Sequence, residues 1–535
     1  MDKSQKQTAA LLAFIAGIYF LLFIPTSLIG AQNAAMLSIF EIDEYAQYPN
    51  ALHMVANAGS LYESIHNFAV YQHYFYGYPF YFFSGLVLLI GKTLLGNDWL
   101  GQTRLVVAVL RLTINVLPML FAAGILTWIV TRFRDRLAAV ITFLLLLLLP
   151  GVVDNNFWWH PDSLAVLFLV LVYFFLDLDH FKFSKFWIMA AVACGVAFGL
   201  KYTGAFFVLA IPLYLYLGWR AKKITTGQVF KHGFLFVITM FAAVIISNPL
   251  LLLPQERPEL IRYQLLQFSQ TGQGIVTSST LQETILKIGQ NFSASFGGIP
   301  TALLCLAGFV LGVRKPAWRT HTLLVAAWSL PYLIIILNVS NFRPHYLLPL
   351  VLPLLSLSAY LLQTAREKGI DRKFISASAI LIMAALLSNF LISQANYAAQ
   401  LNAEKDSKAI QFYQEASHVL APIEALPGIR VYRDWQIYYP GQNNQTVSIN
   451  WEKASFPVIN DFNPDIILLD KRDVTLYADE SILTQAANEG DVAANHAFYL
   501  AAAEKAIPGY SLIFEDAFGM AFVRDKLADQ IHKPG

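Results

Sequence analysis

A succession of apolar runs fills the first three quarters of the chain, and this pattern limits the folds that the chain can adopt. A transmembrane helix needs about 20 apolar residues. Hydrophobic residues make up 56% of the 535 residues and charged residues only 13%, whereas soluble domains carry about 25% charge. The sequence therefore predicts a mainly α-helical, polytopic membrane protein, with apolar runs near 8–30, 79–95, 105–130, 137–151, 163–178, 186–199, 204–218, 230–253, 297–313, 320–337, 345–363 and 373–392.

Basic residues predict the topology, because short cytoplasmic loops retain Lys and Arg. Five basic clusters lie on the cytoplasmic side only if one run before residue 132 does not cross the bilayer: 132–136, 182–185, 220–223, 314–319 and 366–373. The run at 79–95 begins with Pro79 and is interrupted by Gly85, Gly91 and Lys92, so we interpret it as an in-plane or re-entrant helix. We thus expect about eleven transmembrane helices and a cytoplasmic N-terminus. Since no retrieval signal ends the chain, we favour the inner (plasma) membrane over the endoplasmic reticulum.

This topology brings the unusual polar residues to one face of the membrane, outside the cytoplasm. They lie in five predicted loops, whereas a transporter would place some of them near the middle of the bilayer. The loops and their candidate residues are 31–104 with Asp43 and Glu44, 151–162 with Asp154, His160 and Asp162, the turn at Lys201, 254–296 with Arg257 and Arg262, and 338–346 with Arg343, His345 and Tyr346.

The acidic pair Asp43-Glu44 follows the first apolar run, and no Lys or Arg occurs between Lys6 and Lys92. Carboxylates at a membrane surface are costly unless water, cations or a reaction need them. We interpret Asp43 as a general base, with Glu44 as its alternative or as the residue that orients it. The competing interpretation is a solvated helix N-terminus, which also favours acidic residues.

Residues 395–535 differ in character from the membrane part, 1–394. Helical patterns at 408–420 and 476–486 alternate there with strand-like runs at 428–432, 465–469, 510–514 and 520–523, the last two joined in a hairpin-like link. We expect a small soluble α/β domain of three to five strands outside the membrane.

Residues 8–365 resemble the GT-C class of integral-membrane glycosyltransferases, most of all the branch with protein O-mannosyltransferases and the lipid A aminoarabinose transferase. The resemblance rests on the order of several motifs: Asp43-Glu44 after the first span, Gly96-Asn97-Asp98-Trp99 with Arg104, the basic stretch 132–136, Asp162, the turn 199–204, and Asn341-Phe342-Arg343-Pro344-His345-Tyr346. It implies transfer of a sugar from a polyprenyl-phosphate carrier to a lipid, glycan or protein acceptor.

One departure from this branch concerns the carrier phosphate. Much of the branch has a Lys-Pro-Pro-Leu run before the in-plane helix, with its Lys near the phosphate. Here the stretch is Gly77-Tyr78-Pro79-Phe80, so another residue must supply the phosphate contact, or the carrier is held differently. Lys201 and Arg343 are the preferred candidates, because a cation on this face runs against the topological bias. Arg257 and Arg262 are weaker candidates, since Glu256 and Glu259 explain them equally well as ion pairs.

The remaining candidates admit two interpretations each. Asp162 after His160-Pro161 would bind sugar hydroxyls or steer the base, or would simply cap a helix. Asp154 with the aromatic residues after it would contact sugar, or belong to an interfacial Trp belt. His53, His66 and His73 have no compact metal spacing. Asp43, Glu44 and Asp162 could hold a divalent cation, but with Lys201 available we expect no metal and no other cofactor.

Two other functions compete with glycosyl transfer. A transporter or lipid flippase would need charges near span centres, where only Arg111 is a strong candidate. A structural or sensory protein would act through its C-terminal domain. The net charge of +2 gives no support for nucleic acid as a partner, and Cys194 and Cys305 both lie in apolar runs, as packing residues do.

Overall fold

The computed structural model describes residues 1–272, 281–336, 343–367, 369–441, 445–449, 453–485 and 489–531. The chain divides into two compact units. The first contains Met1–Ser27, Pro49–Gly272 and Ser279–Gln400, and the second contains Leu28–Tyr48 together with Leu401–Gly535. The second unit therefore includes a segment of the first predicted outer loop, in addition to residues 401–535 of the C-terminal domain predicted at 395–535.

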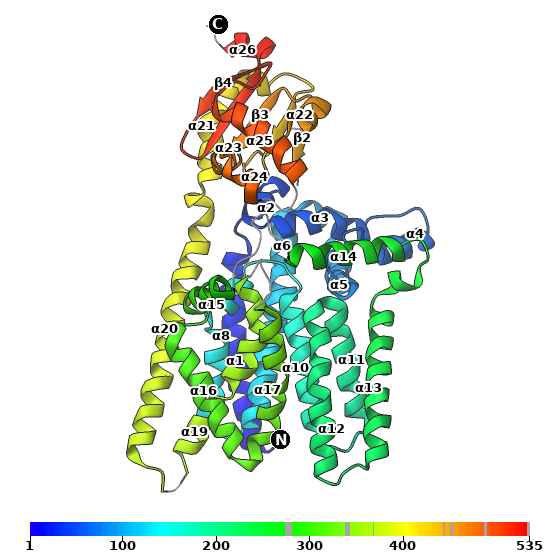
Figure 1. The fold of residues 1–535 in the computed structure, drawn as a ribbon, viewed down its shortest axis with the longest axis vertical. Coiled ribbons are helices and arrows are strands. Elements are labelled where there is room, and N and C mark those ends of the chain that lie inside the picture. Colours follow the sequence, from blue (N-terminus) through cyan, green and yellow to red (C-terminus); the bar gives the residue numbers. More distant parts are fainter. Residues whose placement is uncertain are drawn as a thin grey trace. The chain divides into compact units, whose positions relative to one another are not determined.

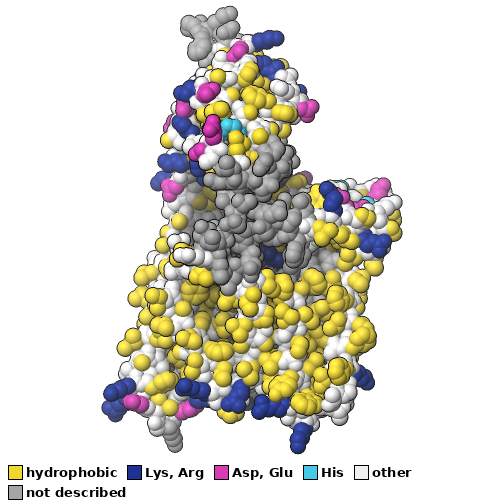
Figure 2. All heavy atoms as spheres, viewed as in Figure 1, with side chains coloured by type: hydrophobic (Ala, Val, Ile, Leu, Met, Phe, Trp, Pro, Cys, Tyr) yellow, Lys and Arg dark blue, Asp and Glu magenta, His cyan; other side chains and the backbone are white. Residues whose placement is uncertain are grey.

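The first unit is a helical bundle (Figure 1), and many apolar side chains are exposed on the face of it shown in Figure 2. Seven helices among the described residues are long and apolar enough to cross a membrane, or up to eight if one bent pair forms a single span. They are α1 (Lys3–Ser27), α5 (Tyr78–Leu95), the stretch Thr103–Thr131, α13 (Thr226–Ser247), α17 (Pro316–Ile336), the stretch Pro344–Ala365 and Arg372–Glu424, and the bent pair is Ile288–Ser295 with Gly298–Arg314. The prediction of a polytopic, mainly α-helical membrane protein is confirmed, while eleven spans remain a prediction.

Shorter helices complete the bundle. Three of them are apolar, at Arg136–Leu147 (α8), Lys185–Leu200 (α11) and Gly204–Arg220. α10 (Asp162–Asp179) packs against α11 and α7 (Leu117–Thr131), and α11 packs against α13. Trp187, Tyr173 and Leu146 are among the fully buried side chains of the continuous apolar core that results.

Basic side chains gather at one end of this bundle, along the lower edge of the face shown in Figure 2. The first and the fifth cluster contact each other through an Arg366–Asp135 ion pair of 2.5 Å. The fourth and the fifth are joined by Lys315 and Glu367. Three of the five clusters are thus joined at one end of the bundle, the arrangement that the charge rule predicts for loops on one membrane side.

α5 is the helix that we predicted to lie in the membrane plane. It is seen close to end-on in Figure 1, whereas α1, α11 and α13 run along the vertical direction. α14 (Arg257–Gly272) also lies across the bundle direction, at the end opposite to the basic clusters. The in-plane assignment of 79–95 agrees with this arrangement, although α5 has the length and composition of a span.

The second unit contains a five-stranded sheet of order β2-β1-β3-β5-β4. β1 (Arg430–Arg433) is parallel to β2 (Thr446–Ile449) and β3 (Ile466–Asp470), while β5 (Gly519–Arg524) is antiparallel to β3 and to β4 (Tyr510–Glu515). The predicted hairpin of the last two strands is confirmed. β2, which the sequence analysis missed, is only four residues long and carries two polar residues in its Thr-Val-Ser-Ile sequence.

Helices cover both faces of this sheet. α21 (Lys408–Glu424) packs its apolar side chains against Ile466, Leu468 and Val523, while α23 (Lys471–Ala478) and α25 (Glu489–Ala503) cover Ile467 and Phe522 on the other face. The remaining helices of the unit include α22 (Phe456–Phe462), α24 (Ser481–Gln485) and α26 (Asp525–Ile531). The predicted small α/β domain is confirmed.

Candidate functional site

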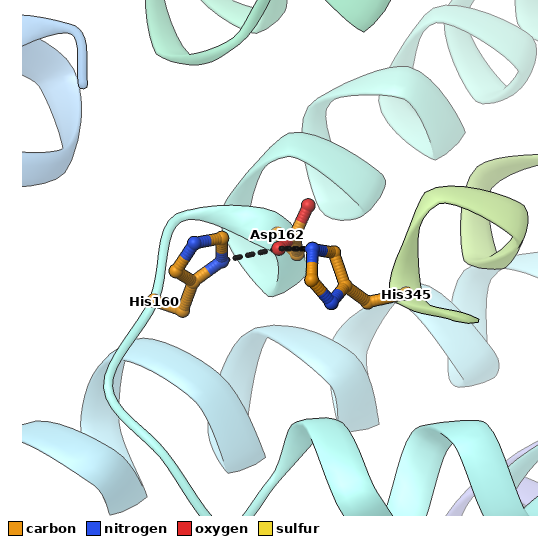
Figure 3. Close-up of side chains that lie close together, drawn as sticks. All are labelled: His160, Asp162 and His345. Carbon is orange, nitrogen blue, oxygen red and sulfur yellow. Dashed lines mark ion pairs between the residues drawn. The ribbon is translucent and has the colours of Figure 1, made fainter. Parts of the chain in front are cut away.

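The centre of the candidate site is Asp162, the first residue of α10, whose side chain is only 4% exposed. Its Oδ1 lies 2.6 Å from Lys201 Nζ. Its Oδ2 contacts His160 Nδ1 and lies 3.7 Å from His345 Nε2. Figure 3 shows both imidazoles pointing at this carboxylate from different segments of the chain. A buried carboxylate needs such partners, because removing its charge from water is costly.

Lys201 reaches Asp162 from the turn that ends α11. The chain leaves the helix in an extended conformation at Lys201 and enters a 3₁₀ helix at Tyr202–Ala210. Gly204 permits this turn, since a Cβ there would stand 2.2 Å from the backbone of Ala197. The lysine side chain is 13% exposed and its Nζ lies 5.0 Å from the centre of the Tyr346 ring. The positive charge is therefore held between a carboxylate and an aromatic ring.

Aromatic rings enclose the two histidines. The His160 ring stacks on Trp158 at 4.1 Å, and its Nε2 shares a hydrogen bond of 2.7 Å with the Tyr76 hydroxyl. His345 lies 5.3 Å from both the Trp158 and His160 rings, measured between ring centres. These contacts fix the orientation of each imidazole toward Asp162.

The loop before α10 is held in place by an irregular turn in a neighbouring helix. Residues Arg111–Val116 form a π-helical turn, a feature that often occurs at functional sites. Asn115 lies in this turn, accepts a hydrogen bond of 3.1 Å from the His160 backbone N–H and donates one of 3.2 Å to the Asn155 carbonyl. Sequence reasoning missed Asn115 and Tyr76, because a single polar residue in an apolar or aromatic run carries no motif.

A cavity of about 270 Å³ opens beside Lys201. Its walls come mainly from the end of α11 and from α14, with Val244 of α13, and its polar groups include Lys201, Asn248 and Gln264 among mostly apolar side chains. Asn248 accepts a hydrogen bond of 3.1 Å from the Tyr78 backbone N–H at the start of α5. The cavity thus has a mostly apolar lining and one cationic side chain, that of Lys201.

The other predicted cations occupy different environments. Arg343 is exposed and directly precedes the 3₁₀ turn Pro344–Leu347 that carries His345. Arg257 is exposed at the first residue of α14. Arg262 forms an exposed ion pair of 2.6 Å with Glu259, as the alternative interpretation held. Of the four predicted cations, Lys201 contacts the Asp162 carboxylate.

Asp154 has a contact outside the Asp162 cluster. Its Oδ1 accepts a hydrogen bond of 2.8 Å from Asn396 of α20 (Arg372–Asp406). Burial raises the pKa of Asp154 to about 6, although the hydrogen bond from Asn396 acts in the opposite direction. A carboxyl group in this state exchanges protons near neutral pH.

Asp43 and Glu44 lie in the first turn of α3 (Ile42–Met54), where carboxylates favour the positive end of the helix. Glu44 is fully buried and Asp43 is partly exposed. Gln47, one turn later on the same helix face, is fully buried, and neither of its amide atoms has a hydrogen-bond partner among the described residues. The pair belongs to the second unit, so its convergence with Lys201 and Arg343 stays a prediction.

His160, Asp162 and His345 also have the ligand types of a metal site. One ligand atom from each lies within 4.8 Å of the others. Two imidazoles and one carboxylate are a common donor set for zinc and other divalent metals. The same carboxylate already bonds Lys201, so a cation would have to share Asp162 with an ammonium group.

A known protein family matches the part of the chain that carries most of these residues. Residues 103–247 match the family model described as dolichyl-phosphate-mannose-protein mannosyltransferase. Asn115, His160, Asp162 and Lys201 all fall inside this stretch. No curated protein matches the chain.

Solved structures match over nearly the whole chain. ArnT from Cupriavidus metallidurans bound to undecaprenyl phosphate has 12% identity and a TM-score of 0.54, with 98% of this chain and 99% of that chain covered. The oligosaccharyltransferase of Archaeoglobus fulgidus, tethered to an acceptor peptide containing the NVT sequon, has 13% identity and a TM-score of 0.52, with 96% and 74% covered. At these identities the likeness establishes the fold.

Proposed function

Because the chain has the fold of the GT-C glycosyltransferases, we propose that it transfers a sugar from a polyprenyl-phosphate carrier to an acceptor hydroxyl or amide at the outer face of the plasma membrane. The observation that carries this proposal is the position of Lys201, which lines an apolar cavity and bonds Asp162 at 2.6 Å. An apolar cavity with one cation at its wall suits a ligand with a hydrocarbon tail and a phosphate head.

The carrier would place its phosphate at Lys201 and its first prenyl units in the cavity between α11, α13 and α14. ArnT, whose fold this chain shares, binds undecaprenyl phosphate. Asp162 keeps the Lys201 ammonium aimed at the site, and Tyr346 covers it. Arg343, with its planar fork of donors, would contact the phosphate from the next segment.

The chemistry requires one bond to form and one to break. The acceptor atom attacks the anomeric carbon of the donor sugar, and the bond from that carbon to the phosphate oxygen breaks. The acceptor's proton passes to a carboxylate, for which we propose Asp43, and Glu44 orients that base. The charge that develops on the departing phosphate is stabilised by Lys201 and Arg343.

This scheme needs no metal ion. Lys201 supplies the positive charge beside Asp162 that a divalent cation would otherwise supply. The imidazoles of His160 and His345 then act as hydrogen-bonding partners of Asp162. A metal-dependent variant of the same reaction would use His160, Asp162 and His345 as ligands.

Transport without covalent chemistry has less support. Arg111, the buried cation expected for that function, is 1% exposed and donates a hydrogen bond of 3.1 Å to the carbonyl of Ser27 at the end of α1. A cation at a helix C-terminus stabilises the helix dipole. This contact gives Arg111 a structural role at the end of α1, so its burial alone does not favour a transport path.

The experiment begins with the lipids that co-purify with the protein, because mass spectrometry of a bound prenyl-phosphate sugar would identify the donor. Transfer from that donor is then measured for wild type, Asp43→Asn and Glu44→Gln. We expect Asp43→Asn to lose about 10²- to 10⁴-fold in turnover, the usual contribution of a positioned base. Glu63→Gln on α4 (Leu61–Ala69), an exposed carboxylate of the same region, is the matched control. Full turnover by a correctly inserted Asp43→Asn protein would refute the assignment of the base.

A further inference from the structure

The last residue of β1, Arg433, is a buried arginine, and its side chain is 1% exposed. Its Nη2 donates a hydrogen bond of 2.8 Å to Ser38 Oγ. Its Nη1 bonds the carbonyl of Ile437, and the carbonyl of Trp435 lies 3.4 Å away. All the acceptors that the described part of the chain offers to this guanidinium are uncharged oxygens.

Burying a guanidinium without a carboxylate is costly. Burial lowers the pKa of Arg433 to about 10, so the group stays charged at neutral pH. A protein that only needed a folded sheet could place an apolar side chain at this position. Since one arm of the fork reaches a different segment of the chain, the contact with that segment is a reason for an arginine here.

The segment that Arg433 reaches carries the acidic pair. Ser38 lies in α2 (Ala34–Phe40), and α3 begins two residues after α2 ends. Asp43 is five residues beyond Ser38. Tyr45 lies in the same turn of α3 as the acidic pair, and it is close enough to Arg433 to feel its charge. Burial raises the pKa of the Tyr45 hydroxyl, and the positive charge of Arg433 opposes this rise.

Other contacts hold the beginning of the same segment. Glu404 accepts hydrogen bonds of 2.7 Å from the Gly30 backbone N–H and 2.6 Å from Gln32 Nε2. Asn33 caps α2, accepting a hydrogen bond from the Met36 backbone, and donates one of 3.2 Å to the Tyr438 hydroxyl. Glu404 and Tyr438 precede and follow Arg433 in the C-terminal part of the chain. Residues 30–38 of this segment are therefore held at several points by residues from beyond position 400.

We propose that Arg433 is a positioning residue, through which the C-terminal α/β domain holds the loop of Asp43 and Glu44 in its reactive arrangement. This inference rests on the proposed function, and it assigns a role to the C-terminal domain. The domain thereby becomes part of the catalytic apparatus without touching the reacting atoms. Displacement of a catalytic group by about 1 Å can lower turnover by 10²-fold, so loss of this contact affects the chemical step.

The test compares Arg433→Ala and Arg433→Lys with Arg430→Ala in the full-length protein. Arg430 is on the same strand, but its guanidinium packs 4.6 Å over the Phe462 ring, away from Ser38. Hydrogen–deuterium exchange is measured for peptides covering residues 30–45 and for strands β3 and β5. Turnover and the KM for the lipid donor are measured on the same preparations.

For Arg433→Ala we expect exchange in 30–45 to rise at least about 10-fold, with β3 and β5 unchanged. Turnover falls about 10- to 100-fold, and the KM for the donor stays within about 3-fold. Arg433→Lys keeps the charge but loses the fork, and recovers part of the turnover. Arg430→Ala changes neither quantity by more than about 2-fold. Unchanged exchange in 30–45, or an equal loss of turnover in Arg430→Ala, would overturn the proposal.

Ser38→Ala keeps the test decisive if Arg433→Ala fails to fold. It removes the loop's side of the contact and leaves Arg433 in the sheet, so exchange in 30–45 rises with the domain intact. Exchange in Ser38→Ala that equals wild type would overturn the proposal. The exchange measurement needs no substrate. A wild-type protein without transferase activity would therefore refute the proposed function, while the exchange data still decide whether Arg433 holds the loop.

Discussion

The carbonyl oxygen of Gly199 lies 1.5 Å from the point at which residue 77 would carry a Cβ. The backbone N–H of Gly77 also faces the Leu200 carbonyl, at 3.4 Å. By the resemblance described above, residue 77 corresponds to the lysine of the Lys-Pro-Pro-Leu run in much of that branch. No side chain fits there in this chain, because the turn after α11 occupies its space. The same turn carries Lys201, which we propose takes over the role of that lysine.

Gly77→Ala should therefore destabilise the protein. The new Cβ would displace backbone atoms, and overpacking of this kind costs about 1–3 kcal/mol or more. Gly227→Ala in α13 is the matched control, since a Cβ there meets no atom within 4 Å. Thermal unfolding in detergent should show a clearly lower midpoint for Gly77→Ala alone. Gly77→Lys should likewise fail to restore the activity of a Lys201 variant. Full restoration would contradict the conclusion that residue 77 has no room for a side chain.

The sequence predicted those features that depend on local pattern. Long apolar runs and basic clusters were enough for a helical bundle whose basic residues share one end. Lys201 was predicted as a phosphate contact because a cation on the predicted outer side runs against the positive-inside rule, which can be applied to the sequence alone. The strands β1, β3, β4 and β5 were predicted from their apolar runs.

The contacts of the site could not be predicted in the same way. His160, Asp162, Lys201 and His345 come from three segments separated by up to about 180 residues, and only packing brings them together. Asn115 acts through a π-helical turn that has no sequence signature. The attachment of residues 28–48 to the C-terminal unit depends on Arg433 and Glu404, which are 395 and 374 residues away from their partners Ser38 and Gly30.

Lys201→Met should remove both activity and stability. Turnover should fall by at least about 10²-fold, because the departing phosphate loses a charged donor. The free energy of unfolding should fall by about 3–5 kcal/mol, since Asp162 is left buried without its ammonium partner. The double variant Lys201→Met with Asp162→Asn should be more stable than Lys201→Met, because neither charge then remains. A double-mutant cycle on thermal unfolding measures this coupling, and strictly additive effects would contradict the ion pair.

Removal of divalent metal should leave transfer unchanged. Lys201 occupies one oxygen of the only carboxylate in the His160–Asp162–His345 group, and its charge opposes a second cation at that place. Transfer is measured after dialysis against a chelator, and again with added Mg²⁺, Mn²⁺ or Zn²⁺. A loss on chelation that added metal restores, and that His345→Ala abolishes, would show instead that the three residues form a metal site.

Arg343 and Arg262 should differ in effect although both were candidates for the phosphate. Arg343→Gln should raise the KM for the donor about 10-fold, the effect of losing one charge-assisted contact of about 1.5 kcal/mol. Arg262→Gln should change it by less than about 2-fold, because an exposed pair with Glu259 contributes little. Equal effects of the two substitutions on the KM would remove Arg343 from the phosphate site.

The C-terminal domain should lose stability as the pH rises from about 4 to about 7. Asp434 is fully buried there, accepting hydrogen bonds from the Tyr499 hydroxyl at 2.8 Å and the Asp470 backbone N–H at 2.9 Å. Burial first, and then the charge of Asp473, raises the pKa of Asp434 from 3.8 to about 7. The folded state therefore keeps a proton that the unfolded chain releases above pH 4. The free energy of unfolding is then highest below pH 4 and falls as the pH rises to 7. The decline should be on the order of 3–4 kcal/mol.

Asp434→Asn should abolish this decline and be more stable than wild type at pH 8, whereas Asp461→Asn, at an exposed position of α22, should behave as wild type. Amide exchange of β3 and β5 between pH 5 and 8, corrected for the intrinsic rate, measures both, and an Asp434→Asn protein that is less stable than wild type at pH 8 would show that the carboxyl is charged in the folded domain.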